Sequence, residues 1–471
     1  MKKTKIIATI GPASKEYDII KKLIENGTDV FRFNLSHASY DFCKDIIEKI
    51  NQANKELNTY SSIMFDLEGP GIRIGKIIGG DAFLKQDDKI RIYMKDVIGD
   101  STKFSVDYKN LIKDVKFNSI IKINDGHVEL QVIDKGIGYI ICKVIKEGVI
   151  TSNCNLNVID IEYEREFLSS KDKEDILFAS EMNVDYLALS HVRNSDDVLA
   201  VNDLLIEIGD DNLSIIAKIE NESAVNDIDS IIRSSDGVMI ARGDLGVSIP
   251  MERVPGIQKT IINKCHIMGK ISIVATELIS SMERQTRPTR AEVSDIANAV
   301  LDGVDAIMLS GETTVGKYPV ETLVVMEKII TSAELDINYL ELLDKAMRTE
   351  KQDTTGLIAY SVTECSNRLK AKAIVTPTIS GYTARKISRF RPSCPIIAVC
   401  TNIETIKNLN LYFGVKPVLI EKLDNLDDII KESRTLATKL IKTEFGDKII
   451  ITGAYPFNDV KHTNFMEIEE L

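Results

Sequence analysis

The sequence lacks the features that define several large classes of protein. Its seven cysteines include no Cys-x-x-Cys pair, which argues against a disulfide framework or a zinc site and indicates a reducing compartment. It has no Walker A motif and no Gly-x-Gly-x-x-Gly segment, so a nucleotide would have to be bound by another architecture. The apolar run Lys5–Ile10 ends at Gly11 and is too short for a signal peptide or a membrane span. We therefore expect a cytoplasmic protein.

Positive charge is also in short supply. The 59 Lys and Arg residues stand against 71 Asp and Glu residues, and the formal net charge of −12 argues against a general nucleic-acid or anionic-membrane surface. We expect neither kind of partner, and positive charge has to be concentrated wherever an anion binds. With 471 residues, 44% of them hydrophobic, the chain is long enough for more than one domain with a large core.

Short apolar segments alternate with helical periods along most of the chain. Eight of these segments read as buried parallel strands: Lys5–Ile10, Asp29–Phe33, Ser62–Phe65, Val184–Leu189, Ser214–Ala217, Gly237–Ile240, Ile271–Ala275 and Ala306–Leu309. A helix is predicted over Ser223–Ser234, and Thr289 with Glu292 forms a capping box that opens another. Eight βα units predict an α/β fold of the closed (β/α)8 TIM barrel type, formed by residues 1–68 and 167–336, with polar strand ends on one rim.

Two further units interrupt and follow the barrel. Residues 69–166 alternate in short stretches between Gly, Asp and Asn turns, which predicts a small β-barrel domain inserted in a loop, here called the lid domain. Residues 337–471 contain a predicted helix at Thr354–Leu369 and further strands, which indicates an open α/β domain. Its hydroxyl-rich loop Thr376–Thr383 enters a helix, and could either hold a phosphate or be an ordinary strand-to-helix cap.

Charged residues follow two predicted strands that are consecutive along the chain. Lys218 and Glu220 come directly after Ser214–Ala217, and Asp244 follows Gly237–Ile240. Two carboxylates at such strand ends suit a hard divalent cation that keeps positions open for substrate oxygens. A lysine beside them suits phosphoryl transfer, in which negative charge gathers. Either carboxylate alone would more often be an ordinary surface charge, so the hypothesis of a site depends on the whole constellation.

Several separate motifs indicate the family that the chain resembles. They are TIGPAS, FRFNLSHASY, DLEGPGIR, IIAKIENESAV, MIARGDLGVSIP, VATELISSM, RPTRAEVSDIANAVLDGVDAIMLSGET and SGYTARKISRFRPSCPIIAV. In combination, over nearly the whole chain, they closely resemble the pyruvate kinase family. The resemblance implies a glycolytic phosphotransferase that moves the phosphoryl group of phosphoenolpyruvate to ADP, giving pyruvate and ATP, with Mg²⁺ or Mn²⁺ as cofactor.

The resemblance also implies roles for individual residues. Glu220 and Asp244 would hold the divalent metal. Lys218 would stabilise the phosphoryl group in transfer, and Arg32 would contact it. The backbone N–H groups of Gly243 and Asp244 would bind the substrate carboxylate.

Further residues of the resemblance concern the proton, the nucleotide and a monovalent ion. The Thr276 hydroxyl would also contact the substrate carboxylate, near the route by which the enolate is protonated. The positions that match the nucleotide side are Asn34, His37, Arg73 and Lys171. The positions that match a potassium (K⁺) site are Asn34, Ser36, Asp66 and the carbonyl of Leu67. Taken singly, these residues have ordinary explanations as well, such as a strand-end cap for Thr276 or a solvated helix charge for Lys171.

The chain departs from the family's pattern at a few positions. Potassium-dependent members usually carry Glu, and independent members Lys, where this chain has Gly71, whereas Leu67 is the residue of independent members, so the chain fits neither pattern. Because no local ammonium group replaces the ion, we expect activation by a monovalent cation. His191 stands where the family commonly has Phe and is interpreted as structural. Asn124-Asp125 replaces the usual Asp-Asp of the lid domain, and Asn153–Ile159 lacks the usual Leu-Pro-Gly of the hinge.

The C-terminal unit resembles the effector-binding domain of the family. A phosphate-bearing allosteric effector is expected at Thr376, Thr378, Ser380 and Thr383. The segment Ala454–Phe465 departs from the common effector loop but keeps Thr463-Asn464. Because the family is usually tetrameric, we expect a homotetramer.

Three hypotheses for the function follow. The first is an active pyruvate kinase. The second is another barrel enzyme that binds pyruvate or phosphoenolpyruvate with a metal, such as an aldolase or lyase, which explains Glu220 and Asp244 but not Lys218 or the lid domain. The third is a non-catalytic paralogue that binds effectors, which explains the C-terminal loop but not the retention of Arg32 and Lys218.

Overall fold

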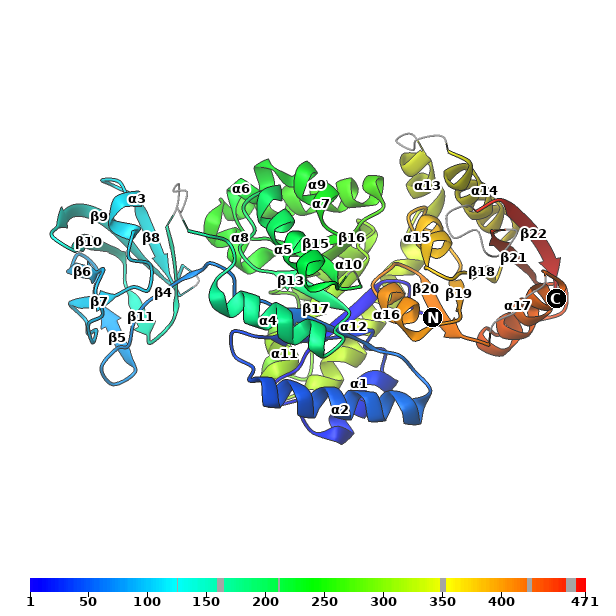
Figure 1. Cartoon of the computed structure of the whole chain (residues 1–471), viewed down its shortest axis with the longest axis horizontal. Helices are drawn as coiled ribbons and strands as arrows, with labels where there is room; N and C mark the ends of the chain where they lie inside the picture. Colours follow the sequence, from blue (N-terminus) through cyan, green and yellow to red (C-terminus); the bar gives the residue numbers. More distant parts are fainter. Residues whose placement is uncertain (125, 159–164, 211, 348–352, 422–425, 455–462) are drawn as a thin grey trace.

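The protein consists of three parts arranged in a row. The computed structural model describes residues 1–471 except 125, 159–164, 211, 348–352, 422–425 and 455–462. Predictions made for Asp125, Ile159 and most of Ala454–Phe465 therefore lie outside the described residues. Figure 1 shows a β-rich part at one end, a barrel surrounded by helices in the middle, and an α/β part at the other end.

Parallel strands close into a barrel at the centre of the molecule, as the sequence predicts. In the order of their pairing around the barrel they are β1 (Lys5–Thr9), β17 (Ala306–Leu309), β16 (Ile271–Ala275), β15 (Gly237–Ala241), β14 (Ser214–Ile219), β13 (Tyr186–Leu189), β3 (Ser62–Asp66) and β2 (Val30–Asn34). Every neighbouring pair is parallel, so all carboxyl ends meet at one rim.

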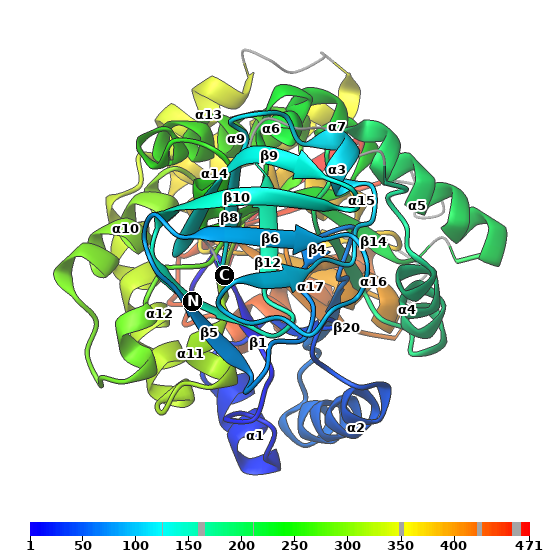
Figure 2. The ribbon, with the colours of Figure 1, turned by 90° about the vertical axis from the view of Figure 1, so that its left-hand side faces the viewer.

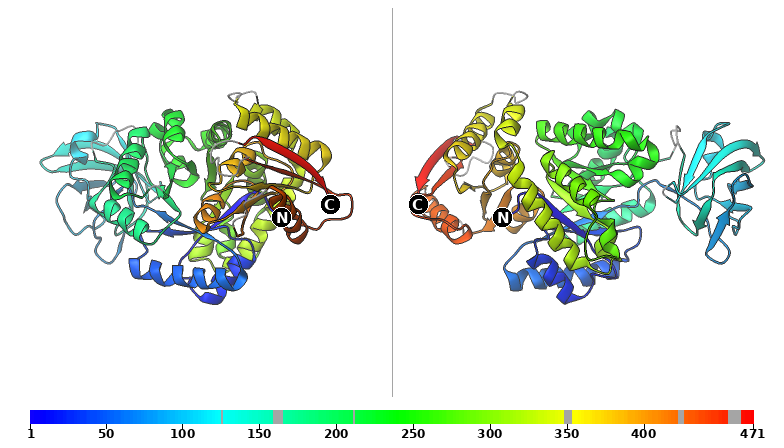
Figure 3. Two further views of the ribbon diagram at one scale, coloured as in Figure 1. Left: turned by 45° about the vertical axis from the view of Figure 1, so that its right-hand side comes forward. Right: turned by 180° about the vertical axis from the view of Figure 1, so that it is seen from behind.

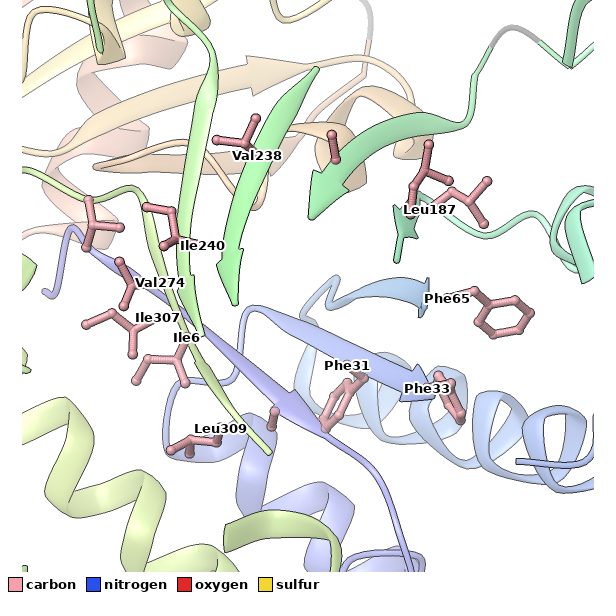
Figure 4. Packing of buried hydrophobic residues seen from close by; sticks show 14 of the residues in the cluster. Ile6, Phe31, Phe33, Phe65, Leu187, Val238, Ile240, Val274, Ile307 and Leu309 are labelled. Atoms are coloured by element: carbon pink, nitrogen blue, oxygen red, sulfur yellow. The ribbon is translucent and has the colours of Figure 1, made fainter. Parts of the chain in front are cut away.

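Apolar side chains alternate between the two faces of these strands. On β1, Ile6 and Ala8 belong to the layer between strands and helices, whereas Ile7 belongs to the barrel interior. Figure 4 shows members of the outer layer, such as Phe31, along the barrel strands. Leu411, from the C-terminal part, joins the interior cluster. Because both faces are packed, the barrel is a rigid support for the side chains at its rim.

Helices surround the barrel. They are α1 (Tyr17–Glu25), α2 (Tyr40–Leu57), α4 (Ser170–Glu181), α5 (Ser195–Ile208), α6 (Glu222–Asn226), α7 (Ile228–Ser234), α8 (Arg242–Ser248), α9 (Val254–Met268), α10 (Arg290–Leu301), α11 (Gly311–Thr314) and α12 (Pro319–Ala333). Short 3-10 turns lie at Met251–Arg253, Ser280–Glu283 and Glu334–Asp336. Within the described part of the chain, no helix is both long and apolar enough to cross a membrane.

The single helix predicted over Ser223–Ser234 is wrong, because α6 and α7 take its place and meet at Asp227. This residue leaves the helical conformation, with φ −100° and ψ 18°. Its carboxylate accepts a hydrogen bond of 2.8 Å from the N–H of Ser195, at the start of α5. The helix is thus interrupted where Asp227 bonds to α5, a segment distant in sequence. The apolar periodicity of the sequence does not indicate this contact.

The capping box predicted at Thr289 is confirmed. The N–H of Glu292 donates to the Thr289 hydroxyl at 3.2 Å, and the Glu292 carboxylate accepts from the Thr289 N–H at 2.7 Å. The same carboxylate accepts from the N–H and the hydroxyl of Ser281, at 2.8 and 2.6 Å. The start of α10 is thereby tied to the loop that follows β16.

The inserted part is a curled β-structure, seen end-on in Figure 2. Its elements are β4 (Ile72–Arg73), β5 (Asp81–Leu84), β6 (Lys89–Tyr93), β7 (Lys103–Ser105), α3 (Leu111–Asp114), β8 (Ile120–Ile123), β9 (Val128–Gly136), β10 (Tyr139–Lys146), β11 (Gly148–Thr151) and β12 (Asn155–Val158). The main sheet has the order β4-β12-β8-β9-β10-β6-β7, and β5 pairs with β11. A bridge between Ile74 and Val106 links the two edges, so the sheet closes on itself as a small barrel does.

The C-terminal part is an open sheet with helices on both faces, seen from two further sides in Figure 3. Its elements are α13 (Tyr339–Met347), α14 (Thr354–Leu369), β18 (Ala373–Pro377), α15 (Tyr382–Ser388), β19 (Ile396–Cys400), α16 (Ile403–Leu409), β20 (Val415–Leu419), α17 (Leu426–Leu440), β21 (Lys448–Gly453) and β22 (Phe465–Glu470). The strand order is β20-β19-β18-β21-β22, with only β22 antiparallel to its neighbour. One apolar cluster packs this sheet against α14, α15 and α16, and another packs it against α17.

A buried ion pair joins the C-terminal part to the barrel. The Arg391 guanidinium lies 2.7 Å from Asp305, and the two side chains are 2% and 3% exposed. The other oxygen of Asp305 accepts from the N–H and hydroxyl of Ser272, at 3.0 and 2.9 Å. Arg391 also donates to the Gly303 carbonyl at 3.0 Å and lies over the ring of Phe413. Either charge would be costly to bury without the other.

Replacing Asp305 with Ala leaves the Arg391 guanidinium buried without a counter-charge. We expect the free energy of unfolding to fall by roughly 3–5 kcal/mol, measured by denaturant titration with a probe in the barrel. Asp302→Ala is a matched control, because Asp302 pairs with Lys259, whose side chain is 71% exposed. The control should cost about 0–1 kcal/mol. Equal losses in the two variants would contradict the prediction.

Candidate active site

Polar side chains gather where neighbouring barrel strands end. Asp66 ends β3, Ser190 follows β13, and Lys218 and Glu220 lie at the end of β14. Arg32 lies on β2, the neighbour of β3. Since these strands are adjacent in the barrel, the five side chains meet at the same rim.

An ion network links these side chains. One oxygen of Asp66 accepts from Arg32 at 2.7 Å (Nε) and 2.6 Å (Nη2). The other lies 3.1 Å from the ammonium of Lys218. That ammonium is also 3.0 Å from Glu220 Oε1 and donates to the Ser190 hydroxyl at 2.7 Å. The four charged side chains are only 1–10% exposed, so their charges are compensated by each other and not by water.

Burial and pairing act in opposite directions on the pKa values in this network. Burial disfavours the charged form of Lys218, but Asp66 and Glu220 hold its pKa above the ordinary value. Burial likewise disfavours the charged Asp66, yet Arg32 and Lys218 hold its pKa below the usual range. The pKa of Glu220 is lowered too, against burial, by Lys218 and His191. The three groups are therefore ionised at neutral pH and present fixed charges.

The turn after β16 brings Thr276 next to the first turn of α8. Thr276 and Glu277 have positive φ values of 66° and 53°, which are uncommon for residues other than glycine. Arg242 donates to both of their carbonyls, at 3.1 and 2.9 Å. The Thr276 hydroxyl accepts from the N–H of Gly243 at 2.8 Å. The N–H that the family resemblance assigns to a substrate carboxylate is thus bonded to Thr276 here.

A cavity of about 170 Å³ lies over this rim. It brings together most of the predicted site residues: Arg32, Asn34, Ser36, His37, Arg73, Lys218, Glu220, Asp244 and Thr276. Gly71, Ser190 and His191 line it as well. The cavity therefore joins barrel residues to Arg73 of the inserted part.

The two carboxylates of the cavity fit the binding of a divalent cation. Glu220 and Asp244 both line it, and their oxygens are the ligands that Mg²⁺ and Mn²⁺ prefer. Among the described residues, no group of three or more His, Cys, Asp or Glu side chains surrounds a metal position. Mg²⁺ is commonly held by one or two carboxylates and completes its shell with water and phosphate oxygens.

One predicted nucleotide residue lies apart from the cavity. Asn34, His37 and Arg73 line the cavity, whereas Lys171 does not. The ammonium of Lys171, on α4, is paired with Asp175 at 2.5 Å. Arg73 is also paired, with a carboxylate of the same cavity wall.

Of the four residues predicted to bind K⁺, two line the cavity and two do not. Asn34 and Ser36 line the cavity, and the Asn34 side-chain oxygen accepts from the Ser36 N–H at 3.1 Å. Asp66 lies beneath the cavity in the ion network, and Leu67 is buried beside it, 2% exposed. The side-chain oxygens of Asn34 and Asp66 are thus engaged with protein donors.

The residues predicted for an effector lie in the C-terminal part. Thr376, on β18, is buried, and within the described residues its hydroxyl has no hydrogen-bond partner. The N–H of Thr378 is bonded into the sheet, and Ser380 is exposed on the loop before α15. The Thr383 hydroxyl lies 2.9 Å from the hydroxyl of Thr463, which brings two segments distant in sequence together.

Two residues of the site, Ser190 and Thr9, were not assigned a role from the sequence, and a third, His191, was interpreted as structural. Ser190 binds Lys218, and Thr9 accepts from Arg32 at 3.0 Å. His191 contacts Glu220 through both its N–H and its ring. Ser190 and His191 directly follow a strand, a position that could have indicated them, whereas nothing in the local sequence around Thr9 marks its contact.

A closed parallel barrel with buried cations and two carboxylates at its carboxyl rim is the architecture of an enzyme and is suited to a phosphorylated anion and a divalent cation. Comparison with known proteins is more specific. The family model described as pyruvate kinase, barrel domain, matches residues 1–323, and the one described as pyruvate kinase, alpha/beta domain, matches residues 357–469. The chain belongs to the pyruvate kinase family, and it is a phosphotransferase of glycolysis.

Individual relatives agree over the full length. The chain is 41% identical to a pyruvate kinase of Sporosarcina psychrophila over 99% of its own length and 80% of the relative's. It is 40% identical to a pyruvate kinase of Clostridium perfringens over 100% of both chains. A crystal structure of a pyruvate kinase from Cryptosporidium parvum superposes with a TM-score of 0.93 at 35% identity, covering 100% of this chain and 96% of the other.

Replacing Asp66 with Asn removes the charge that Arg32 and Lys218 share. Arg32 then loses its counter-ion and Lys218 keeps only Glu220, so the repulsion between the two cations is less compensated and both move from the positions at which they face the cavity. We expect kcat to fall by roughly a hundredfold, measured by initial velocity at saturating substrates. Asp96→Asn is the control, since Asp96 is 92% exposed and pairs with Lys109 on the surface. Wild-type kcat in Asp66→Asn would contradict the assignment of a shared counter-ion.

Proposed function

We propose that Lys218, Arg32 and Thr276 carry the transfer of the phosphoryl group from phosphoenolpyruvate to ADP, which gives pyruvate and ATP. The observation that carries this proposal is the buried ammonium of Lys218, 3.1 Å from Asp66 and 3.0 Å from Glu220. A cation that is kept ionised at this place stabilises the charge that gathers on a phosphoryl group in transfer.

Arg32 and Lys218 form the phosphate subsite. Asp66 holds both in place, so little side-chain freedom is lost when the phosphate binds. Each also donates to a neutral hydroxyl, Arg32 to Thr9 at 3.0 Å and Lys218 to Ser190 at 2.7 Å. Phosphate oxygens are stronger acceptors than these hydroxyls, so they take over these bonds without breaking the ion network.

The substrate carboxylate is assigned to the first turn of α8. The backbone N–H groups of Gly243 and Asp244 lie at the start of this short helix, where N–H groups lack partners within the helix. A carboxylate there replaces the Thr276 hydroxyl as acceptor of the Gly243 N–H and leaves that hydroxyl free to donate to it. We assign Thr276 also to the route by which the enolate carbon receives its proton.

Glu220 and Asp244 would hold Mg²⁺ or Mn²⁺. When bound, such an ion supplies Lewis-acid stabilisation of substrate oxygens. The chain's own contribution is the orientation of Glu220, whose Oε1 lies 3.0 Å from Lys218 and whose Oε2 accepts from the His191 N–H at 2.8 Å.

ADP is assigned to the edge of the cavity. Its residues are Asn34, His37 and Arg73, and also Lys171 of α4, which lies outside the cavity and donates to the Leu35 carbonyl at 3.1 Å. The guanidinium of Arg73 is 2.6 Å from Glu68, so a nucleotide phosphate competes with one carboxylate for it.

A potassium ion is assigned to Asn34, Ser36, Asp66 and the Leu67 carbonyl, and the absence of a side chain at Gly71 supports activation by this ion.

Three domains are proposed: the catalytic barrel (1–68 and 167–336), the lid domain (69–166) and the effector-binding domain (337–471). Their apolar clusters support this division. One cluster of buried residues belongs to the inserted segment alone, from Ile72 to Val158. The clusters of the C-terminal sheet begin at Leu343 and Ala373.

An allosteric effector that carries a phosphate is assigned to Thr376, Thr378, Ser380 and Thr383. Among the described residues the buried Thr376 hydroxyl has no hydrogen-bond partner, which supports a polar ligand there. A homotetramer is proposed as well. Its support is β22, a strand at the edge of the sheet that exposes Met466 (38%) and Ile468 (46%) and can pair with a second copy.

The seven free cysteines support a cytoplasmic location.

The activity test is the initial velocity of pyruvate formation from phosphoenolpyruvate, ADP and Mg²⁺, with and without K⁺. Lys218→Met should lower kcat by roughly 10³-fold or more, because a charge on the transferring group loses its counter-ion. Lys259→Met, at an exposed lysine, is the matched control. K⁺ should stimulate the wild type. A wild type that binds metal and is inactive under both salts would favour a non-catalytic paralogue instead.

The effector test uses alanine at Ser380 and Thr383, which removes two hydroxyls from the loop before and at the start of α15. Activation by sugar phosphates and nucleotides should be lost at subsaturating phosphoenolpyruvate, while kcat at saturation stays unchanged. Ser361→Ala, an exposed hydroxyl on α14, is the control. If every compound that activates the wild type activates the double variant equally, the assignment fails.

A further inference from the structure

His191 makes two contacts with one oxygen of Glu220. It follows β13, and its backbone N–H donates to Glu220 Oε2 at 2.8 Å. Its ring atom Nδ1 lies 3.1 Å from the same oxygen. Glu220 Oε1 is taken by the Lys218 ammonium at 3.0 Å. The carboxylate is therefore held from both sides.

The other edge of the His191 imidazole faces Gly71. A Cβ atom at Gly71 would lie 3.0 Å from His191 Nε2 and 3.3 Å from Cδ2, closer than nearly all real contacts of such an atom. Gly71 is thus the residue that leaves room for this ring. His191 itself has a φ of 59°, uncommon for a residue other than glycine, so its backbone too is set by its surroundings.

We propose that His191 is a positioning residue for Glu220, and that Gly71 is its matching partner. The inference depends on the proposed function, in which Glu220 is a metal ligand. The ring donates from Nδ1 to Glu220 and so fixes the plane of the carboxylate before a cation arrives. Hydrogen-bond partners of a metal ligand commonly contribute 10–100-fold to metal affinity. His191 lines the cavity but needs no contact with the metal or the substrate for this role.

The contact requires a particular form of the imidazole, the one that carries a hydrogen on Nδ1. A phenyl ring has nearly the same shape and no donor, so His191→Phe removes the hydrogen bond and keeps the packing. An asparagine side chain carries a donor at about the distance of Nδ1, so His191→Asn restores the hydrogen bond without the ring. Gly71→Ala leaves His191 unchanged and pushes its ring.

The experiment measures the binding of Mn²⁺ to the free protein by the electron paramagnetic resonance signal of unbound Mn²⁺. His191→Phe should raise the Kd about tenfold, and His191→Asn should recover most of the loss. In steady-state assays the concentration of Mg²⁺ needed for half-maximal rate should rise in His191→Phe, with kcat at saturating Mg²⁺ changed much less. If His191 had a purely structural role, His191→Phe would not weaken metal binding while leaving kcat at saturating Mg²⁺ nearly unchanged.

The Gly71→Ala variant is a second, independent test of the contact between Gly71 and His191. It should weaken Mn²⁺ binding in the wild type, and should have no further effect in a His191→Ala background, where the added methyl group meets no imidazole. Gly256→Ala is the matched control, because Gly256 lies exposed on α9 and an added Cβ has no neighbour within 4 Å.

The outcomes separate this inference from the proposed function. A wild type that binds no Mn²⁺ would overturn the metal site and the inference together. A wild type that binds Mn²⁺, with His191→Phe within twofold of it, would overturn only the role of His191. If His191→Phe fails to fold, the Gly71→Ala arm decides, and equal Mn²⁺ affinity in Gly71→Ala and wild type would overturn the proposal.

Discussion

Two buried cations, Arg32 and Lys218, share the single carboxylate of Asp66, and the geometry of the active site depends on this sharing. Neither cation could be buried alone, because the cost of removing a charge from water far exceeds what neutral partners return. With Asp66 between them, and Glu220 on the far side of Lys218, the charges are paired at 2.6–3.1 Å. The result is a set of fixed, mutually compensated charges that faces a small cavity.

The barrel makes this arrangement possible. Arg32 comes from β2, Asp66 from β3, and Lys218 and Glu220 from the end of β14, and all three strands are packed on both faces. Flexible loops could not hold four charges at such distances without a large loss of conformational freedom. The inserted part adds Arg73 to the same cavity, and its Lys122 donates to the Val247 carbonyl of α8 at 2.7 Å. The segment that carries Gly243 and Asp244 is thus in contact with the inserted part.

Side chains at the ends of strands could be predicted from the sequence. Lys218, Glu220 and Asp66 could be assigned to one rim because they follow apolar runs, and parallel strands bring their ends together. The capping box at Thr289 was equally predictable, since both partners lie within one turn. The role of each residue came from the resemblance to a family, and these roles stay predictions.

Contacts between segments far apart in the chain could not be predicted from local sequence patterns. Asp227 divides a predicted helix while it bonds to Ser195 of another helix. The strand β22 was not predicted, because its side chains alternate between half-buried and exposed on the edge of a sheet. His191 was interpreted as structural, since its contact with Glu220 depends on how the turn after β13 faces β14. Lys171 lies outside the cavity for a similar reason, because the position of α4 is set by packing.

The central claim is that this rim moves a phosphoryl group between two bound substrates. Phosphorus-31 nuclear magnetic resonance of the protein mixed with phosphoenolpyruvate, ADP, Mg²⁺ and K⁺ tests it directly, because each phosphorus species has its own resonance. We expect the phosphoenolpyruvate signal to be replaced by that of the γ-phosphate of ATP in equal amount. Release of the same phosphorus as inorganic phosphate, or an unchanged phosphoenolpyruvate signal from a folded protein that binds Mn²⁺, would contradict it.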